Sequence, residues 1–484
     1  MVDDIRDVVI VGGGISGLTA GWYLHHAGMD VCLLDAQSEV GGVTRTQHRD
    51  GFLLEKGPFN VIVRDPAFIT LLEGLSDEVK IIAASPAAKK RFVYHGGRLL
   101  VIPGNPFALA TTPLLSMSAK LRLVRGLIIG RRSDGSEETI EQVAVRRFGR
   151  EVTDTIISAM VAGIFAGDMK KLSATACFPS VAKVDREARS LIAYGLKAGV
   201  RAKRARKKKE RDGDGPPPAW LGLVSIDGGL GALTAALGAP LGANCVTGCR
   251  VEAIRAADFG YEIDCETVDD GPRTFRTRHL VLAPSVHEAR RLLEPVLPEA
   301  AGILAPIVSA PMVVVNLGFK REDIGHPLDG FGFLVPQSEP DFPLLGVLWA
   351  DSIFPHHAPS GCCLLRVFVG GSRTPDAAAL SSDDLVARAM SGMGDLLQVR
   401  GDPVLVDICR WPAAIPQYHI GHMERMARLR AEIAGTGNLD IVGNYLEGVS
   451  LNDCVRCATN VADKIIGEFM VEDRSRLPAL AASS

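Results

Sequence analysis

The sequence predicts an α/β fold, because short apolar runs alternate with helical patterns near both ends of the chain. Residues 8–11 and 31–34 are continuous apolar runs of the kind that form buried parallel strands, and a helical pattern over residues 18–26 separates them. A strand over residues 439–442 and a helix over about residues 452–466 repeat this order. The chain has 484 residues, which is enough for two or three domains.

The composition is that of a globular protein without a strong overall charge. Hydrophobic residues make up 47% of the chain and the net charge is −3, so nothing favours a nucleic acid as partner. The N-terminus resembles neither a signal nor a transit peptide, and no apolar run reaches the ~18 residues of a membrane span. We therefore expect a cytoplasmic protein whose ten cysteines are reduced. For the pair Cys454 and Cys457, helix packing is favoured over a redox or metal-binding role.

A glycine motif follows the first predicted strand. Gly12, Gly14 and Gly17 have the G-x-G-x-x-G spacing, in which the first glycine forms a tight turn, the second admits a pyrophosphate and the third lets helix and strand pack closely. The N-terminus of the following helix attracts phosphate. Asp35 ends the second strand, where a carboxylate can accept hydrogen bonds from ribose hydroxyls. Together these features predict a dinucleotide site of the Rossmann type rather than a structural turn.

A second glycine pair, Gly41 and Gly42, comes shortly after Asp35. Glycines there let a second loop approach the pyrophosphate from the other side, and Arg45 can add positive charge. An extended FAD needs such a loop, so the sequence favours FAD over NAD. The alternative is a plain turn.

The middle of the chain predicts an insertion into this fold. Residues 99–209 have a largely helical pattern with Ser118 and Thr139 as candidate caps, and the strongly basic residues 201–211 lead into a Gly- and Pro-rich stretch. We therefore expect a discontinuous Rossmann-type FAD-binding domain, a mainly helical insertion and a mixed α+β substrate domain. The expected boundaries are 1–85, 222–293 and 431–470 for the FAD-binding domain, 92–215 for the insertion, 86–91 and 294–430 for the substrate domain, and 471–484 for a C-terminal tail.

Beyond these patterns, the chain resembles a known family over residues 8–466. The glycine pair followed by residues 50–58, Asp-Gly-Phe-Leu-Leu-Glu-Lys-Gly-Pro, is similar to the amine oxidase and protoporphyrinogen oxidase superfamily of flavoproteins. Further segments resemble the protoporphyrinogen oxidases within it, namely 89–99, 163–168, Trp411 with 415–422, and 443–454.

The motifs and the resemblance together give a set of expected FAD contacts. One departure from the family is that Gly57-Pro58-Phe59-Asn60 replaces Gly-Pro-Asn-Ser, which moves the polar side chain by one position. Another is Asp35 in place of the commoner Glu. The expected contacts are Gly12, Gly13, Gly14, Ile15, Ser16, Gly17, Asp35, Ala36, Gly42, Val43, Arg45, Gly57, Pro58, Phe59, Asn60, Val251, Trp411, Val449, Ser450 and Leu451.

The resemblance also implies a reaction, the six-electron oxidation of a porphyrinogen in haem biosynthesis by hydride transfer to the flavin, with oxygen as acceptor. Alternatives are coproporphyrinogen in place of protoporphyrinogen as substrate, a generic flavin amine oxidase or desaturase, and a non-catalytic binder on the same fold. We expect Arg91 to bind a substrate carboxylate. Gly163 would line the pocket, and Phe165 and Phe333 would either pack on the substrate or lie in the core. No metal site and no acid–base set are evident; His419 and His422 are interpreted as structural.

Location and assembly are the last expectations. Residues 99–109 and 113–115 are apolar but too broken by Pro and Gly to span a membrane, and residues 201–211 could attract anionic lipid. We therefore expect either a peripheral protein on the cytoplasmic face of the membrane or a soluble protein with a basic loop. A homodimer is the candidate assembly, although no pattern in the sequence indicates the oligomeric state.

Overall fold

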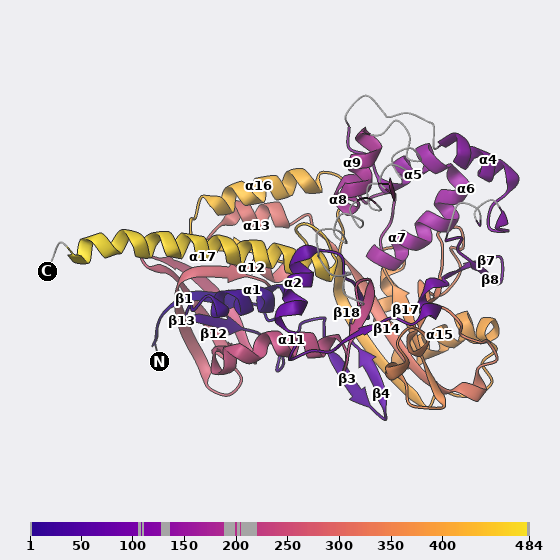
Figure 1. Ribbon diagram of the computed structural model, residues 1–484, viewed down its shortest axis with the longest axis horizontal. Coiled ribbons are helices and arrows are strands. Elements are labelled where there is room, and N and C mark those ends of the chain that lie inside the picture. The colour runs from indigo at the N-terminus through magenta and orange to yellow at the C-terminus, as the bar shows by residue number, and fades with distance from the viewer. Residues whose placement is uncertain are drawn as a thin grey trace.

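The structure is a computed structural model that describes residues 2–104, 108, 111–126, 136–187, 199–200, 204 and 220–481. Two seven-stranded sheets form its framework, and helices surround both. They lie toward opposite ends of the long axis, and a group of helices gathers above the second sheet (Figure 1).

The first sheet has the topology expected of a nucleotide-binding domain. Its order is β10-β2-β1-β13-β12-β11, with β19 also paired to β13; β10, β2, β1, β13 and β19 run parallel, and β11, β12 and β13 form an antiparallel meander. The strands are β1 Val2–Val11, β2 Val31–Leu34, β10 Cys245–Val246, β11 Cys249–Ala257, β12 Gly260–Thr267, β13 Gly271–Leu282 and β19 Leu439–Ile441.

Both faces of this sheet are covered, which explains the continuous apolar run in β1. Val8 and Ile10 pack into the core on one face, and Val9 and Val11 into the core on the other. The first face carries α1 Ile15–His26, α2 Pro66–Gly74, α11 Leu230–Gly238 and α17 Leu451–Ala481, together with a small sheet of β5 Val61–Ile62, β9 Leu223–Ile226 and β6 Ile81–Ala83. The opposite face carries α12 Val286–Leu293, α13 Pro298–Leu304 and α16 His422–Ala434.

The second sheet has the order β18-β14-β17-β16-β15-β7-β8 and is antiparallel except for the pair β15 and β7. Helix α15 Ser382–Leu397 covers one face, where Leu385 and Met393 share a core with Val315 and Val367. The hairpin β3 Thr46–Arg49 and β4 Phe52–Glu55 and the short helix α14 Ala350–Ile353 complete this part. The strands are β7 Phe92–His95, β8 Arg98–Val101, β14 Ser309–Lys320, β15 Gly332–Leu334, β16 Gly346–Trp349, β17 Cys362–Gly370 and β18 Leu405–Pro416.

The described part of the predicted insertion is mainly helical. Thr139 forms a capping box with Gln142, as predicted, whereas Ser118 lies inside its helix and the Ser116 hydroxyl accepts a hydrogen bond from Ala119 N instead. None of the described helices is long and apolar enough to cross a membrane. The helices are α4 Met117–Gly126, α5 Ile140–Phe148, α6 Arg150–Val152, α7 Ser158–Phe165, α8 Ala174–Cys177 and α9 Pro179–Glu187, with a π-helical turn at Thr153–Ile157.

Three expected domain limits differ from the strand pairing and the cores. Strands β7 and β8 fall in the range expected for the insertion, but they pair at the edge of the second sheet. Helix α13 and residues 422–430 of α16 fall in the range expected for the substrate domain, yet the apolar faces of both helices pack on the first sheet. Helix α17 continues to Ala481, through most of the expected tail (Figure 1). Strand pairing places β7 and β8 in the second sheet, and burial of an apolar face places α13 and α16 on the first.

Candidate functional site

The three motif glycines in the turn after β1 have different surroundings. Gly12 has φ +110°, and a Cβ there would lie 2.8 Å from the carbonyl carbon of Ala283. A Cβ at Gly17 would lie 2.0 Å from the carbonyl oxygen of Gly12. A Cβ at Gly14 would meet no atom within 4 Å. The fold therefore requires Gly12 and Gly17, whereas the space beside Gly14 is open to a ligand.

Helix α1 begins at this open space without a side-chain cap and without an acidic residue of its own. Gly14 is the N-cap residue, it supplies no side-chain hydrogen bond, and the first turn contains no acidic residue. The helix buries Ile15, Ser16 and Gly17 against the sheet, so its first N–H groups keep a fixed position. Unpaired N–H groups and the helix dipole favour an anion such as a pyrophosphate.

Asp35 holds the glycine turn in place from the end of β2. Its buried carboxylate accepts hydrogen bonds from Gly13 N at 2.5 Å and from Gln37 N at 2.7 Å. Burial raises the pKa of Asp35. Each carboxylate oxygen has a second lone pair, so the predicted ribose contact remains compatible with this bonding. Cys249 N donates to Asp35 O, which brings Val251 of β11 to the same end of the sheet, and Ala36 is exposed beside them.

The second glycine loop lies against the first. Gly41 N donates to Gly13 O at 2.7 Å, and a Cβ on Gly42 would lie 3.3 Å from the Cα of Gly14. Two loops therefore enclose the open space, as the glycine pair predicts. We expected the positive charge of Arg45 to face a phosphate. Arg45 forms an ion pair with Glu39 at 3.2 Å, which partly neutralises this charge.

Side chains of the second sheet hold residues 55–57, which lead into the next expected FAD contacts. The carbonyls of Glu55 and Gly57 accept hydrogen bonds from the Arg366 guanidinium at 2.5 and 3.0 Å. The carbonyl between them, that of Lys56, accepts one from Trp411 Nε1 at 2.8 Å. Strands β17 and β18 thus fix three successive carbonyls, and they orient the loop of Gly57, Pro58, Phe59 and Asn60.

Arg366 places a buried positive charge behind this loop. It is fully buried, it donates to Asn316 Oδ1 at 3.1 Å, and its guanidinium carbon lies 5.3 Å from the centre of the Phe59 ring. Burial lowers the pKa of Arg366 to about 10, so it stays charged at neutral pH. Burial raises the pKa of Glu55 to about 7, although its carboxylate accepts a bond from Leu230 N at 2.7 Å. Sequence analysis did not identify Arg366, although an arginine inside the apolar strand β17 is a signal.

The last group of expected cofactor residues lies at the start of α17. Ser450 Oγ accepts a hydrogen bond from Asp453 N at 3.3 Å, and Leu451 is buried. Ser16 of α1 and Cys454 of α17 share a hydrogen bond, which joins the starts of the two helices. Burial raises the pKa of Cys454 to about 12 and that of Cys457 to about 11, so both are protonated thiols that pack in the helix.

The contacts described above connect these groups in a series, which we call the track. The track is defined by Val251, Asp35, the two glycine loops, Trp411 and the start of α17. Val43 connects its middle, because a Cβ at Gly57 would lie 2.4 Å from the Val43 carbonyl oxygen. An elongated track of this kind fits an extended dinucleotide such as FAD.

The expected substrate residues are only partly brought to this track. Arg91 is exposed immediately before β7, with its guanidinium 4.8 Å from the centre of the Phe331 ring. Gly163 is exposed on α7, and a Cβ there would lie 3.0 Å from the side chain of Leu334. Phe165 is buried in a core cluster against which Val449 packs.

Phe333 lies in the core, which is one of the two placements expected for it. It pairs with Val347, and both lie in the core under α15. Its neighbour Leu334 faces the other side of the sheet, because side chains alternate along a strand. Phe368 lies on the same side of the sheet as Leu334, because both are paired with Gly346 of β16. Trp411 lies on this side as well, as the pairing of β14 with β17 and β18 shows. Leu334 and Phe368 are half-buried apolar residues, and each packs at the border of a core cluster.

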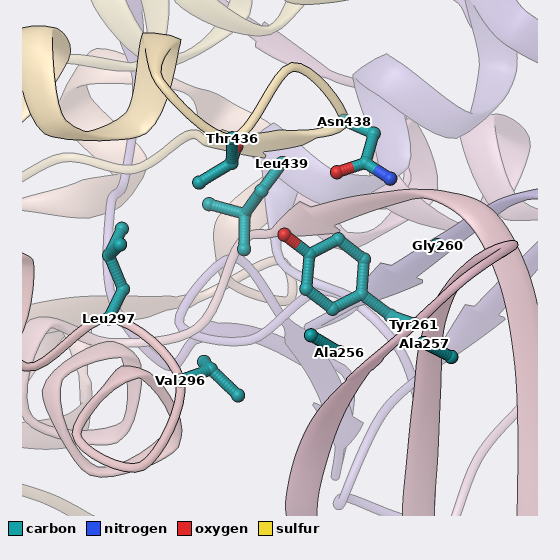
Figure 2. A pocket seen from close by; sticks show the side chains of 9 residues that line it. All are labelled: Ala256, Ala257, Gly260, Tyr261, Val296, Leu297, Thr436, Asn438 and Leu439. Atoms are coloured by element: carbon teal, nitrogen blue, oxygen red, sulfur yellow. The ribbon is translucent and has the colours of Figure 1, made fainter.

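A separate cavity of about 330 Å³ lies away from this track (Figure 2). It is near the amino ends of the parallel strands, whereas Gly12 to Gly17 follow the carboxyl end of β1, the edge at which open α/β sheets bind ligands. We therefore do not assign it to the site. Its lining residues are Ala256, Ala257, Gly260, Tyr261, Val296, Leu297, Thr436, Asn438 and Leu439.

The fold and the glycine turn after β1 define an α/β protein of the dinucleotide-binding type, with a second sheet that contacts the chain at residues 55–57. Residues 15–466 match the model of the flavin-containing amine oxidoreductase family, and the chain belongs to this family. It is a flavin-dependent oxidoreductase, and the expected fold class and superfamily are confirmed.

Two relatives and one solved structure illustrate the similarity. The chain is 31% identical to the chloroplastic protoporphyrinogen oxidase of Nicotiana tabacum, over 95% of this chain and 85% of that protein. It is also 31% identical to the coproporphyrinogen III oxidase of Propionibacterium freudenreichii subsp. freudenreichii, over 95% and 90%. A crystal structure from Exiguobacterium sp. 255-15, assigned as a protoporphyrinogen oxidase, has the same fold, with a TM-score of 0.77, 24% identity and coverage of 96% and 99%.

Proposed function

We propose that the chain is an FAD-dependent, oxygen-dependent porphyrinogen oxidase that converts protoporphyrinogen IX to protoporphyrin IX. The observation that carries this proposal is the sheet face beside the cofactor track. Leu334 and Phe368 give that face apolar, half-buried side chains, and Arg91 adds an exposed guanidinium near its edge. An apolar wall with a cation at its border suits a large ring that bears carboxylates. The names of the two relatives support this substrate class.

The residues of the chain bind and orient rather than exchange protons. A bound FAD would supply the acceptor for the hydride removed at each of three two-electron steps, and the proton lost with each hydride would pass to water. Oxygen would take up two electrons and two protons per step as hydrogen peroxide. The glycine loops would hold the pyrophosphate, and the start of α17 would favour negative charge near the flavin ring. Arg91 would fix the substrate through a carboxylate, and Leu334 and Phe368 would exclude water from the reacting carbon.

Coproporphyrinogen III is the second candidate substrate, because one relative is named for its oxidation. The two porphyrinogens share the ring and differ in the number of carboxylates. Both should be supplied to the purified, FAD-loaded protein in air, and porphyrin formation should be followed by fluorescence. We expect a higher kcat/KM for protoporphyrinogen. A higher value for coproporphyrinogen would change the assigned substrate but not the reaction class.

The same experiment separates porphyrinogen oxidation from the other classes. Oxidation of an alkyl amine such as putrescine, with neither porphyrinogen turned over, would identify an amine oxidase and refute the proposal. A protein that carries no flavin absorbance after purification and reconstitution with FAD would instead be a binder without redox activity. Peroxide formed in a ratio of three to each porphyrin would support the proposed stoichiometry.

We further propose that the protein is cytoplasmic and attaches to the surface of an anionic membrane through α4. Met117 and Leu121 lie one turn apart on this helix, each 69% exposed, and Arg125 is exposed in its last turn. Apolar and basic groups on one short helix suit an anionic lipid surface. Residues 113–115 are less suitable than expected, because Leu114 and Leu115 are buried. The basic residues 201–211 lie outside the described residues except for Arg204.

Flotation with anionic vesicles tests this attachment. We expect the protein to float at low salt, and the double variant Met117→Ser/Leu121→Ser to remain in the dense fraction. Equal behaviour of the two proteins would remove α4 as the contact.

A further inference from the structure

The segment between β18 and α16 contains a buried tyrosine that closes the loop before α17. Tyr418 is 1% exposed. Its hydroxyl accepts a hydrogen bond from Gly448 N at 2.9 Å and donates one to Asn444 O. One side chain thus satisfies two backbone groups at the two ends of residues 444–448. These residues lead directly into Val449, Ser450 and Leu451, the expected flavin contacts.

A histidine supports the same loop from the next turn. The ring of His422 stacks on Tyr418 with centroids 4.1 Å apart and an angle of 14° between the planes, and its Nε2 lies 3.0 Å from Leu446 O. A carbonyl only accepts hydrogen bonds, so Nε2 carries the hydrogen. Burial lowers the pKa of His422 to about 4, so the ring is neutral at pH 7. His422 is therefore a donor to the loop and not a base.

The same segment also holds the helical insertion. The neighbour of Tyr418, Gln417, donates from Nε2 to Phe165 O at 2.9 Å, and Ser173 N donates to Tyr418 O at 2.7 Å. Phe165 ends α7 and Ser173 caps α8. Residues 417–422 therefore connect the insertion, on one side, with the loop before α17, on the other.

Gly448 explains why a single hydroxyl can set the position of this loop. Its φ is +131°, and a Cβ there would lie 2.3 Å from the carboxyl carbon of Asp453, so the backbone passes close to the first turn of α17. The Tyr418 hydroxyl fixes the N–H of Gly448 at this point. We propose that Tyr418 is a positioning residue, which aims the N-terminus of α17 at the flavin ring and makes that aim depend on the insertion. This inference rests on the proposed function for the place of the flavin.

The chain provides a matched control in the same loop. Tyr445 is also fully buried, but its hydroxyl has no hydrogen-bond partner among the described residues. Tyr418→Phe and Tyr445→Phe therefore each remove one buried oxygen from the same region, and only the first breaks bonds to the loop. Removing the hydrogen-bond partner of a buried polar group changes an equilibrium constant, here the dissociation constant for FAD, about tenfold or more.

The experiment measures flavin properties in the full chain. For Tyr418→Phe we expect a dissociation constant for FAD raised about tenfold, and a lower flavin reduction potential, because a misdirected helix N-terminus stabilises the reduced anion less. A tenfold preferential loss for the reduced form equals about 30 mV for a two-electron couple. Tyr445→Phe should match the wild type in both quantities. His422→Phe keeps the stacked ring but loses the bond to Leu446 O, and it should shift both quantities in the direction of Tyr418→Phe.

Several results would overturn the positioning role. One is a Tyr418→Phe protein that melts at a lower temperature yet keeps the wild-type dissociation constant and potential, since a purely structural bond gives this pattern. Another is an equal shift in Tyr445→Phe. If Tyr418→Phe does not fold, an unchanged flavin reduction potential in His422→Phe would also overturn the positioning role. Wild-type protein that binds FAD but oxidises no porphyrinogen would refute the proposed function and leave the flavin measurements valid.

Discussion

The open space beside Gly14 leads to a sharp prediction for Gly14→Ala. The new methyl group would meet no protein atom within 4 Å, and the residue has φ −74° and ψ 177°, which alanine adopts readily. The folded protein should therefore change in stability by about 1 kcal/mol or less, the usual cost of alanine at an N-cap. The methyl group would instead occupy the space in which a pyrophosphate approaches the start of α1.

The expected decrease in FAD affinity is much larger than the decrease in stability. Each hydrogen bond to a charged group contributes about 1.5–3 kcal/mol, so removing one hydrogen bond to a phosphate raises the dissociation constant about 10- to 150-fold. Titration of the apoprotein with FAD, followed by quenching of flavin fluorescence, measures this constant. Thermal unfolding of the apoprotein measures stability independently.

Two further glycines complete the comparison. A Cβ at Gly302 of α13 also meets no atom within 4 Å, so Gly302→Ala should preserve FAD affinity and raise stability by up to about 1 kcal/mol, the helix preference of alanine over glycine. Gly17→Ala should impair folding itself, because its Cβ would lie 2.0 Å from the Gly12 carbonyl oxygen. Wild-type FAD affinity in a folded Gly14→Ala protein would refute the assignment of this turn to the cofactor.

Three other predictions concern the substrate, the buried charge and pH. Arg91→Ala should lower kcat/KM for the porphyrinogen about ten- to a hundredfold with FAD retained, and an unchanged value would exclude Arg91 from the site. Arg366→Met should lower the free energy of unfolding by about 3–5 kcal/mol in denaturant titrations, because buried carbonyls lose a charged donor; a decrease below about 1 kcal/mol would contradict this. The pKa of His422 falls from its ordinary value of 6.5 to about 4 in the folded protein, so the unfolded chain binds more protons between these values. From pH 7 to pH 4 the wild type should therefore lose about 3 kcal/mol more stability than His422→Gln, and parallel curves would contradict the lowered pKa.

The first βαβ unit could be predicted from the sequence because its signals are local. The strands, the glycine turn and the acid all lie within residues 8–35, and each has a direct physical reason. The same holds for Thr139, whose capping partner Gln142 is three residues away. Predictions of this kind need no knowledge of which distant segments meet.

The orientation of Phe333 could not be predicted in the same way. A shift of one residue moves every side chain of a strand to the opposite face, and β15 is only three residues long, so it has no pattern of its own. The pairing of β15 with β16 determines which side chains of β15 face each side of the sheet. Phe333 is paired with Val347, and Leu334 with Gly346. The sequence presented an aromatic residue at 333 and a leucine at 334, and only the pairing decides which of them lies on the same side of the sheet as Trp411.

Arg366 has a local signal in the sequence, but its partners are distant in the chain. A charged residue in the middle of β17 is unusual enough to indicate a role, because buried arginines occur almost only with partners. Its partners, however, are the carbonyls of Glu55 and Gly57, which precede it by 311 and 309 residues. They have no side-chain signature, since every residue has a carbonyl. The sequence can therefore indicate that a buried cation matters, whereas the loop that it orients becomes evident only when the two sheets are placed together.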